Sequence, residues 1–222
     1  MTDIRVFVLN GINRLAGLQA NYVLVKGQDA LLIDASCSLS SLGEVLSATG
    51  AKLRAILLTH CHFDHCASAK DLCALAPLIA HPYTATMLKE GTWKAGLPLP
   101  YVADWQPQQT VEDGQLLHLG SFCVQAIYTP GHTADGVCYL IDDTYLASGD
   151  VVMNDMVCGA TVFPTGDAVQ LRASGQKLWD TCPPSVRILG GHVARFDRAD
   201  WAEYDSPSTV GRARVRNQIN QL

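Results

Sequence analysis

The sequence lacks any apolar run that approaches the roughly 20 residues needed for a membrane-spanning helix. Its first ten residues also lack the charged-then-apolar pattern of a secretion signal. These two absences predict a cytoplasmic protein that has no membrane partner.

An excess of positive charge is absent as well. The chain carries 16 Lys and Arg against 21 Asp and Glu, which gives a formal net charge of −5. A general basic field that would hold a polynucleotide is therefore excluded, although a local basic patch stays open. We expect a small-molecule substrate, no nucleic acid, and either a monomer or a homodimer.

Cysteine is not scarce, but paired cysteine motifs are. Eight cysteines occur without a single C-x-x-C pair, and several lie inside apolar runs. This distribution predicts buried, reduced thiols rather than disulfides, and it includes Cys61 and Cys66.

The order of the expected elements predicts the fold class. A chain of 222 residues that is 48% hydrophobic can form one globular domain over residues 1–222. We expect strands at 4–9, 21–25, 30–33, 54–58, 78–80, 115–119, 122–128, 137–141, 145–147 and 186–189, with helices at 41–49, 67–75, 82–89, 167–183 and in the tail after 192. Two halves, each with strands followed by helices, predict an α/β fold, a four-layer αββα sandwich.

The densest cluster of metal-ligating residue types follows the apolar run at residues 54–58. It reads His60-x-His62-x-Asp64-His65. In extended chain His60 and His62 project to the same side, and Asp64 and His65 follow where the chain must turn. Four ligand types in six residues favour a shared metal site, with room for a second metal, over unrelated loop histidines.

Three later strand ends repeat this arrangement. His132 follows the strand expected at 122–128, Asp150 follows 145–147, and His192 follows 186–189. Each of the three comes directly after a glycine. Each alone would be typical of an ordinary turn, but together they complete a set of seven ligand types.

This order of motifs, over residues 20–192, resembles the metallo-β-lactamase superfamily and within it the glyoxalase II-like branch. The resemblance implies one metal held by His60, His62 and His132, a second held by Asp64, His65 and His192, and a bridging carboxylate from Asp150. It also implies that Asp34, with Thr59 and Thr133, supports the ligands from behind. The ligand set suits two Zn²⁺ and tolerates Fe or Mn, with Asp64 and Asp150 as catalytic residues around a metal-bridging hydroxide.

Several reactions fit this resemblance. The β-lactamases of the superfamily do not place a bridging aspartate at the position of Asp150, so a hydrolase of esters, thioesters or lactones is favoured. A phosphodiesterase of the same fold is one alternative. A mononuclear iron persulfide dioxygenase that uses His60, His132 and Asp150 is another. A non-catalytic relative is disfavoured because no ligand is missing.

Two segments are candidate walls of the site. Residues 91–109 carry Trp93, Tyr101 and Trp105 in a proline-rich stretch, which predicts either a lid that contacts the substrate or a surface loop. The stretch after Asp150 is apolar through residue 163, with Asn154 as a polar substrate contact. Few cations occur in either wall, so we expect small or moderately apolar acyl substrates.

Overall fold

A computed structural model describes residues 3–11, 20–100, 102–153, 159–192 and 201–203. Two of the predicted substrate contacts, Tyr101 and Asn154, lie outside the described residues.

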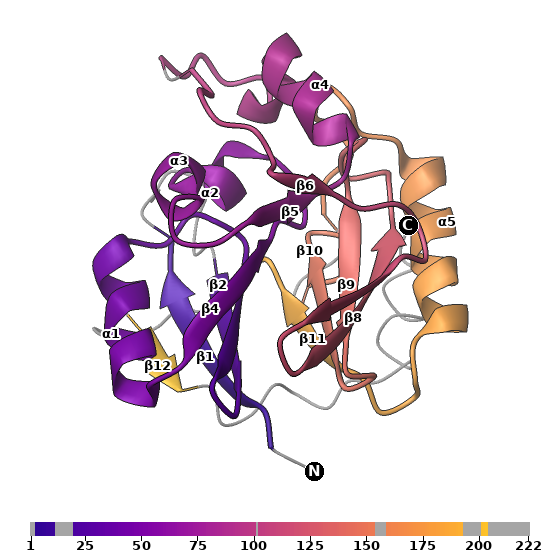
Figure 1. Ribbon diagram of the computed structural model, residues 1–222. Helices are drawn as coiled ribbons and strands as arrows, with labels where there is room; N and C mark the ends of the chain where they lie inside the picture. The colour runs from indigo at the N-terminus through magenta and orange to yellow at the C-terminus, as the bar shows by residue number, and fades with distance from the viewer. Residues whose placement is uncertain (1–2, 12–19, 101, 154–158, 193–200, 204–222) are drawn as a thin grey trace.

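Two mixed sheets form the centre of the molecule (Figure 1). The first has the strand order β12-β1-β2-β3-β4-β5-β6, with bounds β1 Arg5–Asn10, β2 Ala20–Lys26, β3 Asp29–Ile33, β4 Lys52–Leu57, β5 Leu78–Ala80, β6 Gln109–Thr110 and β12 Trp201–Glu203. The second has the order β11-β10-β9-β8-β7, with bounds β7 Leu116–Leu119, β8 Phe122–Tyr128, β9 Val137–Ile141, β10 Tyr145–Gly149 and β11 Arg187–Gly190.

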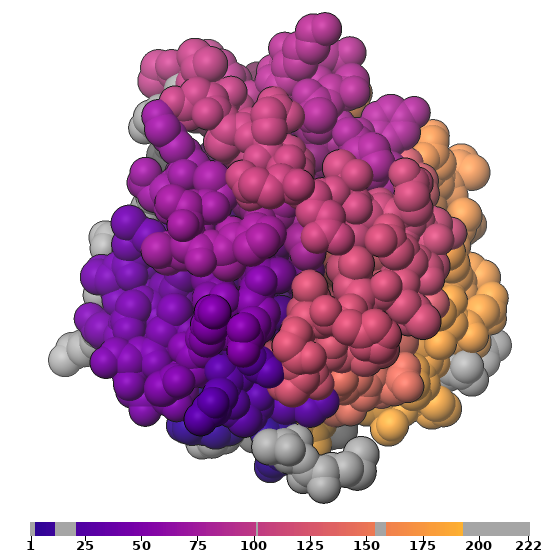
Figure 2. Space-filling model, in the orientation of Figure 1, coloured from indigo at the N-terminus to yellow at the C-terminus, as the bar shows by residue number. Residues whose placement is uncertain are grey.

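Helices cover the outer faces of both sheets (Figure 1). The helices α1 Leu39–Thr49, α2 Phe63–Cys66, α3 Ala69–Leu72 and α4 Tyr83–Glu90, with the 3₁₀ turn η2 Thr92–Lys94, belong to the first half, and α5 Ala168–Thr181 to the second. Figure 2 shows the two halves in contact on the face it presents.

Alternation of side chains explains why two sheets can be buried on both faces. In β2, Tyr22 and Leu24 belong to the apolar cluster that also contains residues of the second sheet. Val23 and Val25 belong instead to the cluster formed with the helices of the first half. A third cluster packs α5 on the second sheet. Because successive strand residues face opposite sides, these three clusters define four layers, which confirms the αββα sandwich.

Short polar residues set the ends of the two longest helices. Ser38 caps α1 by accepting a hydrogen bond from the amide of Ser41 at 3.1 Å, and Gly50 ends it at φ 67°. Asp167 caps α5 by accepting from the amides of Val169 and Gln170, as the sequence predicts. The first helix begins two residues before the expected start at residue 41.

The helix expected at residues 67–75 is limited to α3, Ala69–Leu72, and a separate turn of helix, α2, comes before it at Phe63–Cys66. Between them the chain turns to bond with the loop after β3: the amide of Ser68 donates to the Ala35 carbonyl at 2.8 Å, and the amide of Ala35 donates to the His65 carbonyl at 2.7 Å. These bonds replace the bonds of a continuous helix and hold the ligand-bearing turn against β3.

The tail also differs from expectation where it is described. Residues 201–203 form β12, which pairs antiparallel with β1 instead of forming part of a docked helix. The other residues of that predicted helix lie outside the described ranges. No helix in the described part of the chain has both the length and the apolar character needed to cross a membrane.

Candidate metal centre

The candidate ligands of the first half lie just beyond β4. His60 and His62 occupy the extended connection after this strand, and Asp64 and His65 lie on the single turn of α2. All four side chains are buried. The short helix therefore turns two further ligand types toward the same place as the two preceding histidines.

The second half contributes three more side chains, each located after the end of a strand of the second sheet. His132 follows β8, Asp150 comes directly after β10, and His192 is two residues beyond β11. Within the described residues, three groups each bring their ligand atoms within 4.8 Å of one another: His60, His62 and His132; His60, His65 and Asp150; and Asp64, His65 and His192.

Asp150 lies between the other members of this set. Its Oδ1 is 3.3 Å from Nε2 of His65, whereas its Oδ2 is 3.4 Å from Nε2 of His132 and 3.3 Å from Nε2 of His192. Nε2 of His192 also lies 3.6 Å from Oδ2 of Asp64. The two oxygens of one carboxylate thus face different histidines, which is the arrangement a bridging ligand needs.

Burial and mutual charge set the protonation of the cluster. Burial, reinforced by neighbouring histidines, holds the pKa of His60 and of His62 well below the usual range, so both rings are neutral near pH 7. Burial also raises the pKa of Asp64. Burial opposes the ionised form of Asp150, but His65, His192 and His132 overcome it and hold its pKa well below the ordinary value.

Hydrogen bonds on the far side of two rings determine which nitrogen faces the cluster. Nδ1 of His132 donates to the Ala160 carbonyl at 2.8 Å, and Nδ1 of His65 donates to Oδ2 of Asp34 at 2.8 Å. A carbonyl or carboxylate oxygen only accepts, so these Nδ1 atoms carry the protons. Burial opposes the charged form of His65, but Asp150, Asp34 and Asp64 overcome it and hold the pKa of this ring well above its usual value. Loss of the Nε2 proton to a bound metal would leave the lone pair of that nitrogen facing the cluster.

Asp34 supports ligands on both sides of the cluster. It ends β3 at φ 62°, a conformation that aspartate adopts more readily than most residues. Its Oδ1 accepts from the amide of Thr59 at 2.8 Å and from the Thr59 hydroxyl at 2.9 Å, and that hydroxyl lies 3.2 Å from Nδ1 of His60. One carboxylate therefore orients His65 directly and His60 through Thr59.

The residues present fit a pair of divalent metals. Among the described residues, Nε2 of His60 has no hydrogen-bond partner, although this atom is buried. Nδ1 of His62 lies 3.0 Å from Nε2 of His132, so nitrogens of both rings reach the same small volume. Neutral imidazoles and carboxylates are the ligands that Zn²⁺ prefers, and an unpartnered buried nitrogen is costly without a cation.

Glycines allow the backbone to approach the ligands closely. A Cβ on Gly191 would lie 2.3 Å from Oδ1 of Asp150 and 2.6 Å from a ring carbon of His65. A Cβ on Gly159 would lie 2.6 Å from Nδ1 of His132. These positions exclude larger residues because the ligand side chains occupy the space.

Asp135 is a supporting residue that the sequence analysis missed. It is fully buried, and its Oδ2 accepts from the amide of Cys61 at 3.0 Å and from the Thr84 hydroxyl at 2.8 Å. Cys61 lies between His60 and His62, so a carboxylate of the second half fixes the first ligand loop. The signal in the sequence was a carboxylate three residues after a candidate ligand, just before an apolar strand.

The other predicted residues show packing or burial but no hydrogen bond to a candidate ligand among the described residues. Thr133 is buried, and its hydroxyl has no hydrogen-bond partner among the described residues. Trp93 and Trp105 are 6% and 8% exposed and belong to the apolar cluster beneath the helices of the first half. Packing is the role shown for these two rings, and their contact with a substrate stays a prediction.

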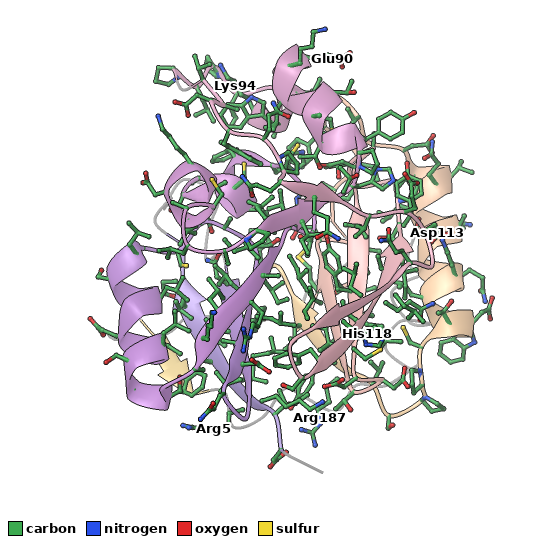
Figure 3. The ribbon with its side chains drawn as sticks, viewed as in Figure 1. Arg5, Glu90, Lys94, Asp113, His118 and Arg187 are labelled. Atoms are coloured by element: carbon green, nitrogen blue, oxygen red, sulfur yellow. The ribbon has the colours of Figure 1, made fainter. Side chains whose placement is uncertain are left out.

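The two histidines outside the expected ligand set also take no part in the three groups. His81 is buried and stacks on Tyr128, with 4.1 Å between ring centroids. His118 is exposed on β7, where Figure 3 labels it. Neither placement gives these histidines a role in the three groups.

The chain is similar in sequence or fold to several known proteins. A family model described as the metallo-beta-lactamase superfamily matches residues 15–192. A "probable polyketide biosynthesis zinc-dependent hydrolase" of Bacillus velezensis is 32% identical over 74% of this chain and 68% of its own length. A hydroxyacylglutathione hydrolase of Acidiphilium cryptum is 30% identical over 95% of this chain and 80% of its own length. The crystal structure of TTHA1623 in a di-iron-bound form has a TM-score of 0.68 and 27% identity, covering 84% of this chain and 92% of that one.

Proposed function

The chain belongs to the metallo-β-lactamase superfamily, a family with metal-dependent hydrolases among its members, and on this basis we propose that it is a binuclear hydrolase of an ester, thioester or lactone. The observation that carries the proposal is the position of Asp150 between two three-residue groups. His60, His62 and His132 would hold one metal, and Asp64, His65 and His192 the other.

Two Zn²⁺ ions in these positions would supply Lewis acidity and a source of hydroxide near neutral pH. The protein's own residues orient the ligands. Asp34 keeps the proton of His65 on Nδ1, and the Ala160 carbonyl does the same for His132. Burial keeps His60 and His62 neutral by lowering their pKa.

The nucleophilic side chains near the ligands support a water-derived nucleophile. The thiols of Cys61 and Cys66 are buried, and burial raises the pKa of each well above its usual range. The Ser148 hydroxyl is buried and donates to the Val152 carbonyl at 2.5 Å. A buried thiol or a hydroxyl engaged in this way is poorly placed to attack a substrate.

The iron persulfide dioxygenase is the second candidate and needs only His60, His132 and Asp150. The group of Asp64, His65 and His192 is intact and buried or half-buried, which favours the binuclear hydrolase. The same intact group fits a phosphodiesterase of this fold, so the choice of substrate separates those two.

The test combines elemental analysis of the purified protein with a substrate panel. We expect two transition metals per chain and hydrolysis of at least one ester, thioester or lactone. A bis(4-nitrophenyl) phosphate arm detects phosphodiesterase activity. One iron per chain with oxygen uptake on a persulfide would instead establish the dioxygenase and overturn the proposal.

A further inference from the structure

Phe163 stands directly against two of the candidate ligands. Its ring makes edge-to-face contacts with His62, at 5.1 Å between centroids, and with His132, at 5.7 Å. The side chain is only half-buried, so part of the ring remains accessible beside these two imidazoles. This residue lies after Asp150, on a segment without regular secondary structure.

The segment that carries Phe163, residues 159–166, is held to the ligand loops at several points. The amide of Gly159 donates to the Asp150 carbonyl at 2.7 Å, and the Ala160 carbonyl accepts from His132 at 2.8 Å. The amide of Asp167 donates to the Gly131 carbonyl at 2.7 Å. We call residues 159–166 the ledge. Its bonds to both strand-end loops fix the position of Phe163 relative to the ligands.

The ledge carries no charged side chain. Val162, at its tip, is 86% exposed. The nearest charged residue along the chain, Asp167, is engaged as the cap of α5. An exposed valine next to an accessible aromatic ring leaves apolar surface beside the candidate metal centre.

A second uncharged segment meets the ledge. A Cβ on Gly96 would lie 3.9 Å from Cγ of Pro164, so Gly96 lies against the ledge. Residues 95–100 carry no charge, and Leu97 is 44% exposed. Lys94, just before them, donates to the Leu99 carbonyl at 2.9 Å. Figure 3 labels Lys94 together with Glu90 at one end of the molecule.

We propose that Phe163 is a specificity-determining residue that packs against the acyl chain of the substrate, and that the ledge selects uncharged, apolar acyl groups. This inference rests on the proposed hydrolase function and names its substrate class. Burial of one methylene against such a surface corresponds to about a fourfold gain in kcat/KM. A terminal carboxylate on the same chain would lose that gain because the described residues of the ledge and of segment 95–100 offer it no cation.

The test uses three N-acetylcysteamine thioesters: acetyl, hexanoyl and adipoyl, the last carrying a terminal carboxylate on a six-carbon chain. The parent is expected to favour hexanoyl over acetyl, and hexanoyl over adipoyl. Phe163→Leu keeps an apolar side chain and should keep the preference. Phe163→Gln, which replaces the ring with a smaller, polar side chain, should reduce the hexanoyl-to-acetyl ratio about tenfold. Leu116→Ala, at an exposed position on β7, is the control that should change nothing.

Two further arms make the outcome decisive. Val162→Arg places a cation at the exposed tip of the ledge, and it should raise the adipoyl-to-hexanoyl ratio several-fold. Calorimetric titration with hexanoate and with acetate, on metal-loaded protein, reads the same preference without turnover. Metal content is measured for each variant.

The role of Phe163 would be overturned if the parent, Phe163→Gln and Val162→Arg all hydrolyse thioesters with the same chain preference. The proposed hydrolase function would not be affected by that result. A different result would overturn the proposed function and still support the apolar ledge. In that case no ester, thioester or lactone is hydrolysed, hexanoate binds more tightly than acetate to the parent, and Phe163→Gln loses this difference.

Discussion

Asp34→Asn is expected to weaken metal binding on the His65 side of the centre without unfolding the protein. Asp34 has φ 62°, and asparagine occupies this left-handed region about as readily as aspartate. The two side chains are also nearly equal in size. The substitution therefore changes the polarity of the hydrogen bonds at this position and little else.

The amide of the variant cannot satisfy every donor that the carboxylate accepts. Oδ1 of Asp34 accepts twice from Thr59, and Oδ2 accepts from His65. The backbone amide of Thr59 is a permanent donor, whereas an imidazole can move its proton to the other nitrogen. The asparagine oxygen is therefore expected to face Thr59, and its NH₂ group to face Nδ1 of His65. The ring must then accept at Nδ1 and carry its proton on Nε2, where it blocks the lone pair.

The magnitude follows from the burial of the three groups. Asp34, Thr59 and His65 are at most 2% exposed, so solvent does not compensate for the lost bond. Loss of an orienting partner of a metal ligand typically costs about 10-fold to 100-fold in metal affinity, or about 1.4–2.7 kcal/mol. We expect this loss for one of the two metals, with the other affected less.

Competition against a chromophoric chelator measures both affinities. Asp142→Asn is a matched control, because Asp142 also has a positive φ, at 49°, and accepts a hydrogen bond from the amide of Cys123 at 3.0 Å, away from the ligands. It should bind both metals like the parent. Parental affinity for both metals in Asp34→Asn would refute the argument from the protonated nitrogen.

Four further outcomes are expected. Asp150→Asn should lower metal affinity by about 100-fold in the chelator competition and turnover with it, since an amide cannot offer two anionic oxygens. Gly191→Ala should lower metal content in elemental analysis while circular dichroism stays unchanged, because its Cβ would meet Asp150 at 2.3 Å. Asp135→Ala should cost about 1–3 kcal/mol in urea unfolding by leaving the buried Cys61 amide without its acceptor, and Asp135→Asn should cost less. Removal of metal with a chelator should lower the thermal midpoint. At a free metal concentration of 100 times Kd, bound metal contributes about 2.7 kcal/mol to the free energy of unfolding, and this contribution is lost.

The candidate ligands were predictable because their chemistry and their position are both local. His60 to His65 are adjacent in the chain, and His132, Asp150 and His192 each follow a recognisable strand and glycine. The four-layer fold was predictable for a related reason, since alternation along strands such as β2 indicates burial on both faces.

Supporting residues were harder to predict because their partners are far away in the chain. Asp135 contacts an amide 74 residues earlier, and no local pattern records that contact. The packing of Trp93 in the core of the first half was also not evident from the irregular, proline-rich stretch in which it lies, and its contact with a substrate stays a prediction. The break between α2 and α3 depends on a backbone bond from Ser68 to Ala35, which residue preferences do not reveal.

The position of the metal centre couples ligand geometry to the packing of the two sheets. The group of His60, His62 and His132 draws on both halves of the chain. Around it, hydrogen bonds also cross between the sheets: the amide of Val137 donates to the Thr59 carbonyl at 2.9 Å, and the Tyr139 hydroxyl donates to the Leu58 carbonyl at 3.0 Å. Each of these bonds ends next to a ligand.

The contacts of the β2–β3 hairpin with the β7–β8 and β9–β10 turns are of another kind. There Lys26 pairs with Asp142 at 2.9 Å, and the amide of Ser121 donates to Asp29 at 2.7 Å, without any ligand residue. Those contacts are partly exposed, and such pairs contribute little to stability because water and salt screen them. Near the ligands, by contrast, a bound metal would join residues of both sheets directly, so it would stabilise the packing of the two halves as well as supply the chemistry between them.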